Sequence, residues 1–280
     1  AGYTTLMCGK WHLSDWRNDK GTPVDRGFYR FFGFLGGAIN YFTGKNFGSD
    51  DNYMRLDREV YNVPRDFYAT DAFTDYALRF LEKRPSDKPF FLYMAYNAPH
   101  FPLQVPREEI EKYHGRYAMG WDSLRQSRYE RMIRMGLVDP QWELSQRDPI
   151  VPPWKTLSRE QQEEEQLLMA AYAGMVDRMD QQIGRLLDYL DQQGIIDNTM
   201  VMFLSDNGGC PFDFNHTPNR PPGPSGSTRT YDTEWANASN TPFRLYKQWI
   251  HEGGISTPFI IRWPGVVKAG SITREPAQLI

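Results

Sequence analysis

Continuously apolar segments of strand length alternate with helical patterns along this chain. Residues 89–96 and 199–204 are apolar runs without the alternation of a half-exposed strand, and they follow helical patterns over 66–84 and 158–193. Strands that are apolar on both faces are typical of parallel sheets that helices cover on both sides. The sequence therefore predicts an α/β fold with a mostly parallel sheet and helices on both faces.

The ends of these segments carry further local signals. Ser158 and Gln161 form a capping-box pattern at the start of the longer helix, and Gly194 follows its end. Further strands are expected over 3–8 and 257–263. Residues 211–241 are rich in Pro, Gly, Ser and Asn, and this stretch is too long for a plain connector. We expect it to be a functional or mobile loop.

Composition excludes several classes of protein. The 280 residues fit one large α/β domain, or one domain and part of a second, and the net charge of −3 argues against broad nucleic-acid binding. No apolar run is long enough to span a membrane, and no secretory signal is visible at the start of the chain. Two cysteines, Cys8 and Cys210, are too few for a disulfide scaffold or a thiolate zinc site.

Polar side chains follow the predicted strands at the points where those strands end. Because ligand groups gather at the carboxyl ends of strands in α/β sheets, these side chains are candidates for one site. Each also has a simpler interpretation as a solvated loop end, a structural turn or, for Asp-Asn-Gly-Gly, a common turn sequence. The candidates are Lys10, His12, His100, Asp206, Asn207 and, just before the last strand, Lys247.

These residue types favour an anionic ester as the ligand. Asp206 and Asn207 supply the oxygen ligands that Ca²⁺ and Mg²⁺ prefer. Two lysines would neutralise a multiply oxygenated anion, and two histidines can move protons near neutral pH. The set suggests a phosphate or sulfate ester, although the residues alone identify no nucleophile.

Four separate motifs resemble the type I sulfatases of the alkaline phosphatase superfamily. They occur in that family's order: GKWHL at 9–13, APHFPL at 98–103, FLSDNGG at 203–209 and TPFRLYKQWIHEGGISTPFIIRWPG at 241–265. Residues 120–128 and 172–187 are similar to the arylsulfatase branch. The resemblance implies an alkaline-phosphatase-like sheet that is incomplete at both ends. Residues 1–280 are then expected to be a partial catalytic domain without its N-terminal strand, its nucleophile segment and its C-terminal subdomain.

The resemblance also implies a role for each candidate residue. Asp206 and Asn207 match calcium ligands, with Mg²⁺ less favoured, and His12 assists the nucleophile. Lys10, His100 and Lys247 match residues that contact the sulfate or the departing alcohol. The family's nucleophile is a formylglycine made from a Cys or Ser in a C/S-x-P-S-R signature. Neither Cys8 nor Cys210 stands in that signature, so the formylglycine is expected upstream of this chain.

The expected function is hydrolysis of a sulfate monoester of an aryl alcohol or a carbohydrate. The 280 residues alone are expected to be inactive, because no nucleophile is present. Two alternatives remain open: a phosphodiesterase or phosphonate monoester hydrolase of the same superfamily, and a non-catalytic relative or fragment that only binds anions. Family resemblance favours the periplasm or the cell exterior, although the residues leave the cytoplasm open, and they do not indicate an oligomeric state.

Overall fold

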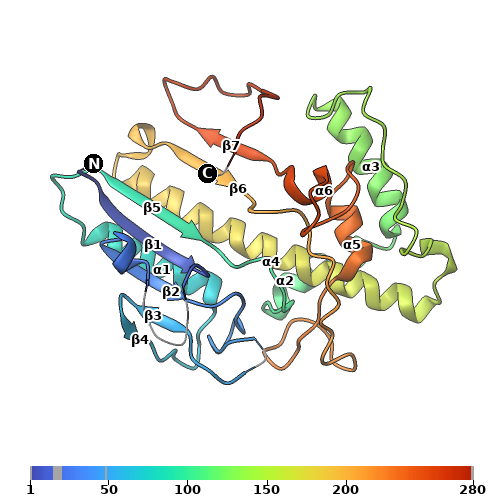
Figure 1. Ribbon diagram of the computed structural model, residues 1–280, viewed down its shortest axis with the longest axis horizontal. Helices are drawn as coiled ribbons and strands as arrows, with labels where there is room; N and C mark the ends of the chain where they lie inside the picture. The colour runs from blue at the N-terminus through green and yellow to red at the C-terminus, as the bar shows by residue number, and fades with distance from the viewer. Residues whose placement is uncertain (1, 15–20, 48, 279–280) are drawn as a thin grey trace. The chain divides into compact units, whose positions relative to one another are not determined.

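The computed structural model describes residues 2–14, 21–47 and 49–278 (Figure 1). The chain divides into two compact units. Unit 1 comprises Ala1–Lys112, Ala171–Leu190 and Asn215–Arg229. Unit 2 comprises Tyr113–Ala170, Asp191–Phe214 and Thr230–Ile280.

Unit 1 is built on a five-stranded sheet with the order β4-β3-β2-β1-β5. Strand β1 (Thr4–Lys10) lies between β2 (Arg30–Phe34) and β5 (Phe90–Ala95) and is parallel to both. Strands β3 (Met54–Leu56) and β4 (Glu59–Val60) continue the sheet in antiparallel order. The parallel centre and its helices confirm the predicted α/β fold class.

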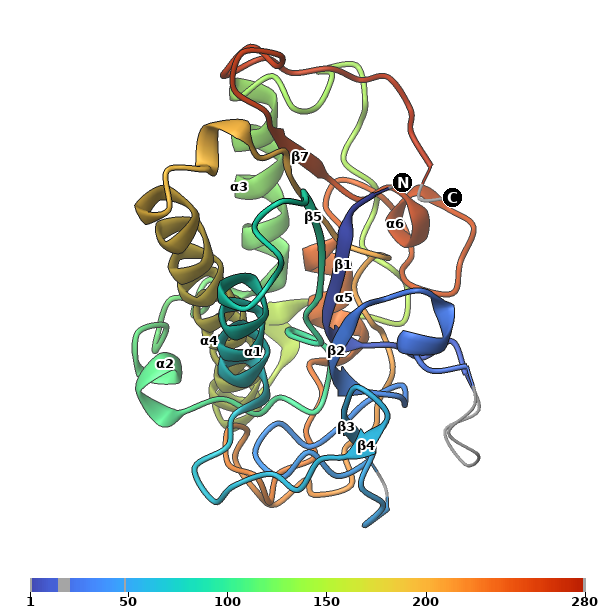
Figure 2. The same cartoon turned by 90° about the vertical axis from the view of Figure 1, so that its left-hand side faces the viewer.

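Helices cover one face of this sheet through stacked aromatic side chains. Helix α1 (Ala69–Glu82) places Tyr76 on Phe32, with ring centroids 3.6 Å apart. The part of α4 (Arg159–Gln192) that belongs to unit 1 lies beside α1 (Figure 2). An ion pair of 2.8 Å between Arg185 and Asp75 joins the two helices.

The opposite face of the sheet is covered by a loop. Met7, Phe31 and Leu35 form a buried cluster there. Side chains from the loop that contains η1 (Val24–Arg26) pack against this cluster. In unit 1, α1 and α4 thus cover one face of the sheet, and the loop with η1 covers the other.

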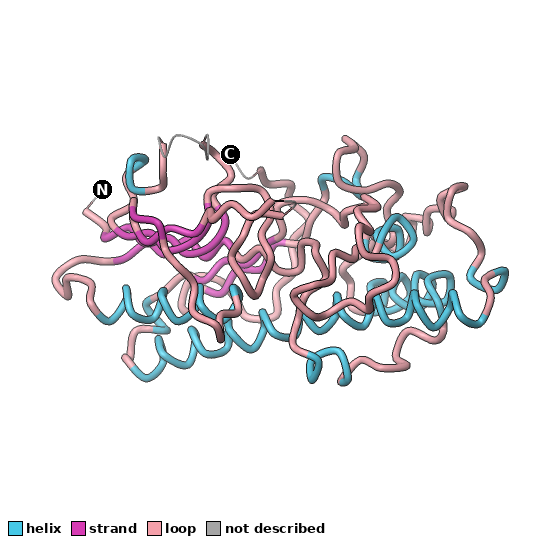
Figure 3. Tube along the Cα trace, turned by 90° about the horizontal axis from the view of Figure 1, so that it is seen from below, coloured by secondary structure: helices cyan, strands magenta, loops and turns pink. Residues whose placement is uncertain are grey.

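Unit 2 contains helices, a short sheet and long loops. Figure 3 shows how helices, strands and loops alternate along the described chain. Strands β6 (Val201–Leu204) and β7 (Phe259–Arg262) pair antiparallel in a two-stranded sheet of their own. The apolar run at 199–204 is thus a strand as predicted, but it does not pair with the sheet that contains β1 and β5. The other elements of unit 2 are the first part of α4, α3 (Gly120–Arg134), α5 (Asp232–Ser239), α6 (Glu252–Ile255), η2 (Trp154–Thr156) and η3 (Ile196–Asn198).

Two local predictions have opposite outcomes. The capping box at the start of α4 is confirmed, because Ser158 Oγ accepts from the Gln161 N–H at 3.2 Å and Gln161 Oε1 accepts from the Ser158 N–H at 2.8 Å. The long loop predicted over 211–241 is wrong in part, because it contains α5. Trp235 of that helix is fully buried beside Trp121 at a centroid distance of 5.4 Å, so tertiary packing supports a helix that the composition does not suggest.

Unit 1 also includes α2 (Arg107–Glu111), a short helix that precedes the boundary at Lys112. Along the described parts of the chain, every helix is too short or too polar to cross a bilayer.

Candidate functional site

Lys10 and His12 lie at the carboxyl end of β1 in unit 1. Beyond β1, the backbone remains hydrogen-bonded to the end of the β2 segment. The His12 N–H donates to the carbonyl of Leu35, the residue after β2, at 3.2 Å. His12 has a left-handed backbone with φ of 53°. Its imidazole lies over Gly37, where an added Cβ would be 2.9 Å from two ring atoms. The position of this ring therefore requires a glycine beneath it.

His100 lies on the loop that follows β5. The register pairs Gly9 with Ala95, so this loop leaves the sheet at the same edge as Lys10. The His100 N–H donates to the Asn97 carbonyl at 2.8 Å, and its Nδ1 is 2.8 Å from the Phe101 carbonyl oxygen. A carbonyl can only accept, so Nδ1 carries the proton and the basic lone pair of the neutral ring is on Nε2.

Gln104 fixes the same loop from inside unit 1. Its side chain is fully buried, and its Oε1 accepts from the Tyr41 N–H at 2.8 Å. Its Nε2 donates to the carbonyls of Ser225 and Ser227 at 3.0 and 2.8 Å. One glutamine thus joins three segments that are far apart in sequence. Sequence reasoning missed it, because a single glutamine after a proline-rich turn has no distinguishing pattern.

In unit 2, Asp206 and Asn207 directly follow β6. Asp206 is exposed, and the Asn207 Nδ2 donates to the Gly208 carbonyl at 2.9 Å. The two residues offer hard oxygen atoms that suit Ca²⁺, but that ion takes six to eight ligands. Among the described residues, no three carboxylate, imidazole or thiolate side chains gather as a metal site. Asp206 and Asn207 therefore fit as part of a calcium site and would need further ligands.

The glycine pair after Asn207 has a packing explanation. The Gly208 N–H donates to the Gly254 carbonyl at 3.1 Å, and an added Cβ at Gly208 would be 1.8 Å from the Gly253 carbonyl oxygen. An added Cβ at Gly209 would be 2.6 Å from the Tyr231 hydroxyl oxygen. The two glycines allow this turn to pack tightly within unit 2.

Lys247 is held beside the same turn. Its N–H donates to the Gly209 carbonyl at 3.1 Å, and its residue is half-buried. The backbone around it is not helical, because Leu245 and Gln248 have left-handed φ values of 64° and 78°. A helix cannot continue through such residues. Lys247 lies instead in a series of turns before α6.

Asn240 joins these two segments and was missed by sequence reasoning. Its Oδ1 accepts from the Gly209 N–H at 2.8 Å, and its Nδ2 donates to the Leu245 carbonyl at 2.9 Å. A single side chain therefore fixes both the turn after Asn207 and the approach to Lys247. Asparagine in a turn is so common that the sequence contains no signal for this role.

The predicted site residues thus form two local groups, and their individual roles stay predictions. The unit 1 group consists of Lys10, His12 and His100, and the unit 2 group consists of Asp206, Asn207 and Lys247.

Comparison with known protein families gives a match over nearly the whole chain. The sulfatase family model matches residues 1–279. An arylsulfatase from Klebsiella aerogenes is 35% identical over 289 residues, which cover 97% of this chain and 62% of that protein. An uncharacterised sulfatase from Schizosaccharomyces pombe is 34% identical over 98% of this chain and 54% of its own length. Mouse N-acetylgalactosamine-6-sulfatase is 26% identical and is covered over 41% of its length.

Solved structures show the same kind of similarity. Ps i-CgsB, crystallised with k-i-k-neocarrahexaose, is 25% identical with a TM-score of 0.59, over 96% of this chain and 46% of that chain. BT4656, crystallised with D-glucosamine-2-N,6-O-disulfate, has a TM-score of 0.50 at 22% identity and supports the fold alone. The chain thus spans 62% of the arylsulfatase and about half of the other proteins it resembles.

Proposed function

This chain belongs to the sulfatase family, and we propose that the whole protein hydrolyses sulfate monoesters, with a sulfated carbohydrate as its substrate. Relatives named as an arylsulfatase and as an N-acetylgalactosamine-6-sulfatase support this reaction class. The carbohydrate in the complex of Ps i-CgsB supports the choice of a sugar. The choice between aryl and sugar alcohols is the part that most needs an experiment.

One observation carries the proposal. The backbone N–H of the half-buried Lys247 donates to the Gly209 carbonyl, which holds the Lys247 backbone beside the turn that follows Asp206 and Asn207. A sulfate ester has three peripheral oxygens that carry negative charge. A lysine ammonium beside a divalent cation bound by Asp206 and Asn207 would stabilise such an anion and its transition state.

The remaining predicted residues would stabilise charge on the sulfate or transfer protons. Lys10 would donate hydrogen bonds to the sulfate oxygens. His12 would accept the proton of the attacking hydroxyl group. His100, whose basic lone pair is on Nε2, would interact with the sulfate or the departing alcohol when that nitrogen is protonated. A calcium ion bound by Asp206 and Asn207 would draw charge from the same oxygens.

The nucleophile is proposed to be a formylglycine outside these 280 residues. Cys210 lacks the required following residues, and so does Cys8. Burial also raises the pKa of the Cys8 thiol far above its ordinary value, which disfavours its thiolate form. Neither thiol therefore competes with an external nucleophile for the role.

The test is to produce the protein from its full coding sequence and compare three substrates. We expect turnover of 4-nitrophenyl sulfate to exceed that of bis(4-nitrophenyl) phosphate and of a phenylphosphonate monoester. A chelator should reduce that turnover, and mass spectrometry should detect the aldehyde of formylglycine. Faster phosphodiester cleavage would overturn the sulfatase assignment, and no turnover of any substrate would favour an anion-binding relative. Sustained turnover by the 280 residues alone would overturn the proposed location of the nucleophile.

A further inference from the structure

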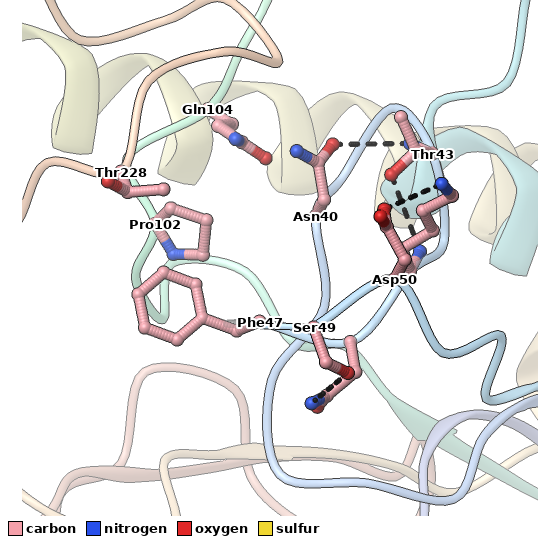
Figure 4. Close-up of a pocket in the computed structure, with 10 residues that line it drawn as sticks. Asn40, Thr43, Phe47, Ser49, Asp50, Pro102, Gln104 and Thr228 are labelled. Atoms are coloured by element: carbon pink, nitrogen blue, oxygen red, sulfur yellow. Dashed lines mark hydrogen bonds and ion pairs between the residues drawn. The ribbon is translucent and has the colours of Figure 1, made fainter. Parts of the chain in front are cut away.

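A cavity of about 480 Å³ lies within unit 1, between the 40–50 segment, the loop after His100 and Thr228 (Figure 4). Its volume is within the range of roughly 300–1,000 Å³ that is common for small-molecule sites. Amide and hydroxyl side chains form most of its lining. No predicted site residue lines it, so it is a separate feature that needs its own explanation.

The cavity adjoins the loop that carries His100. Pro102 and Gln104 of that loop line it directly. Phe47, which also lines it, packs edge-on against Phe101 at a centroid distance of 5.3 Å. The Phe101 ring in turn lies 4.3 Å from the His100 imidazole. Two aromatic side chains in contact, Phe47 and Phe101, therefore connect the cavity to His100.

Two amide side chains that line the cavity, Asn40 and Gln104, already form hydrogen bonds within the protein. Asn40 Oδ1 accepts from the Phe42 and Thr43 N–H groups at 3.0 and 3.2 Å, and Asn40 Nδ2 donates to the Ser225 carbonyl at 2.7 Å. The buried Gln104 also uses both of its polar atoms within the protein. These amides shape the cavity and have little capacity for a ligand.

The mouth of the cavity offers groups with remaining capacity. Lys45 Nζ is 2.7 Å from Asp50 Oδ1, and the two side chains are 48% and 94% exposed. The hydrogen bond from Lys45 lowers the pKa of Asp50, which favours its carboxylate form. An ammonium has three donors and a carboxylate has several lone pairs, so this pair can bind hydroxyl groups as well as each other. Exposed ion pairs contribute little to stability and can rearrange at small cost.

Apolar and charged groups occupy different sides of the cavity. Figure 4 shows Phe47 and Pro102 together on one side, with Thr43 and Asp50 on the other. A ligand that matches both sides has an apolar face and a rim of hydroxyl groups. A sugar ring has both features, whereas an aryl group lacks the hydroxyl rim. A bare sulfate ion is also disfavoured, because Asp50 offsets the charge of Lys45.

We propose that this cavity binds a sugar ring of the alcohol part of the substrate, with Phe47 against the ring face and Lys45 and Asp50 on its hydroxyl groups. The inference rests on the proposed sulfate ester hydrolysis for its biological meaning. Binding of the sugar itself does not depend on turnover. Selectivity for sugar over aryl sulfates would then arise in unit 1, at residues other than those predicted to act on the sulfate.

The test compares two pocket variants, Phe47→Ala and Lys45→Ala, in the full-length protein. The substrates are 4-nitrophenyl sulfate, N-acetylgalactosamine 6-sulfate and a sulfated neocarra-oligosaccharide. The measured quantity is the ratio of kcat/KM for the better sugar sulfate to kcat/KM for the aryl sulfate. Each pocket variant should lower this ratio at least tenfold. The matched controls Tyr29→Ala and Lys88→Ala, whose side chains are exposed elsewhere in unit 1, should leave it within twofold.

A second measurement separates this inference from the proposed function. Calorimetric titration with the unsulfated forms of both sugars should show binding to the wild-type protein, and the two pocket variants should weaken it at least tenfold. Such binding without any sulfatase turnover would support the cavity while overturning the proposed reaction. Turnover of the aryl sulfate with neither sugar binding nor sugar sulfate turnover would overturn the cavity assignment and the choice of a sugar substrate, and would leave sulfate ester hydrolysis standing. An unchanged ratio in both pocket variants, with thermal unfolding like wild type, would also overturn it.

Discussion

The predicted site residues of unit 1 follow parallel strands, whereas those of unit 2 lie on turns that a few specific contacts hold in place. In unit 1, the β1–β5 ladder sets Lys10 and the His100 loop at one edge of the sheet. In unit 2, the two-stranded sheet ends at Leu204, and hydrogen bonds from Gly208, Asn240 and Lys247 fix the turns beyond it. In unit 1, many backbone hydrogen bonds of the ladder together hold the predicted site residues in place. In unit 2, a few residues hold them.

This difference predicts where single substitutions are most damaging. A residue beside a ladder can change without moving the strand, because the ladder depends on backbone groups. A turn that depends on one side chain and one glycine contact has no further hydrogen bonds to hold it when one of these is lost. Substitutions at Lys247, Gly208 and Asn240 test whether unit 2 has that sensitivity, in order of decreasing expected effect.

Lys247→Ala should reduce kcat/KM for a sulfate ester by about 10²-fold or more, because a charge-assisted donor to the developing anion is lost. Lys247→Arg should also lose most of the activity, since a planar guanidinium does not replace a compact ammonium. The exposed Lys268 provides the control, and Lys268→Ala should have little effect. Steady-state kinetics of the full-length protein would measure this. Near-normal rates in both folded Lys247 variants would remove Lys247 from the site.

Gly208→Ala should destabilise unit 2 by about 1–3 kcal/mol, because its Cβ would be 1.8 Å from a carbonyl oxygen of the backbone. Gly184→Ala provides the opposite control. That glycine lies inside α4 with no atom near its added Cβ, so alanine should stabilise the helix by roughly 0.5–1 kcal/mol. Urea unfolding of both variants would measure the loss of stability in Gly208→Ala and the gain in Gly184→Ala. Equal midpoints for Gly208→Ala and wild type would show that the turn can relax.

Asn240→Ala should cost about 1–2 kcal/mol, because it leaves the Gly209 N–H and the Leu245 carbonyl without their side-chain partner. If Asn240 positions Lys247, kcat/KM should also fall about tenfold, which is a loss of roughly 1.4 kcal/mol in the transition state. Asn240→Asp keeps the acceptor for Gly209 and should lie between alanine and wild type in both readouts. Asn198→Ala, at an exposed position of unit 2, is the control. A stability loss with no change in rate would limit Asn240 to a structural role.

The sequence predicted those parts of the fold in which local signals and tertiary structure agree. Helix α4 has an apolar stripe, a capping box and a closing glycine, and the structure begins and ends it within a residue of the expected limits. Strand β5 is equally clear as a short apolar run after a helix. Such elements depend on periodicity, which a single sequence contains.

The parts that the sequence did not predict depend on distant partners. Helix α5 has few strong helix formers, and its support comes from Trp235 packing beside Trp121 and donating to the Glu165 carbonyl at 3.0 Å. The backbone of the Lys247 segment is fixed by contacts to Gly209 and Asn240. Neither contact produces a recognisable pattern in the local sequence. The candidate residues could be proposed from strand ends, but the means of holding them could not.

The smallest effect we predict concerns pH and distinguishes the two units. Burial, followed by repulsion from Glu234 and Asp232, raises the pKa of the Glu165 carboxyl in unit 2 to about 8. Its Oε2 is buried without a hydrogen-bond partner in the described structure. The unfolded chain releases this proton near pH 4.5, the ordinary value for a glutamic acid. Between these two pH values the folded state holds a proton that the unfolded state has lost, so stability falls as pH rises.

We therefore expect the free energy of unfolding to decrease by an amount on the order of 1 kcal/mol between pH 5 and pH 8. This decrease is smaller than the difference between the folded and unfolded pKa values of Glu165 would give, because a protein relaxes around a buried charge. Glu165→Gln should remove most of this slope, since the amide is neutral at every pH. Trp121 and Trp235 are buried in unit 2, so their fluorescence reports on the unfolding of that unit. Hydrogen exchange of amides in β1 should show little pH-dependent change in opening free energy after correction for intrinsic exchange. A slope that persists in Glu165→Gln, or that is equally steep in β1, would show that the effect does not arise from this carboxyl.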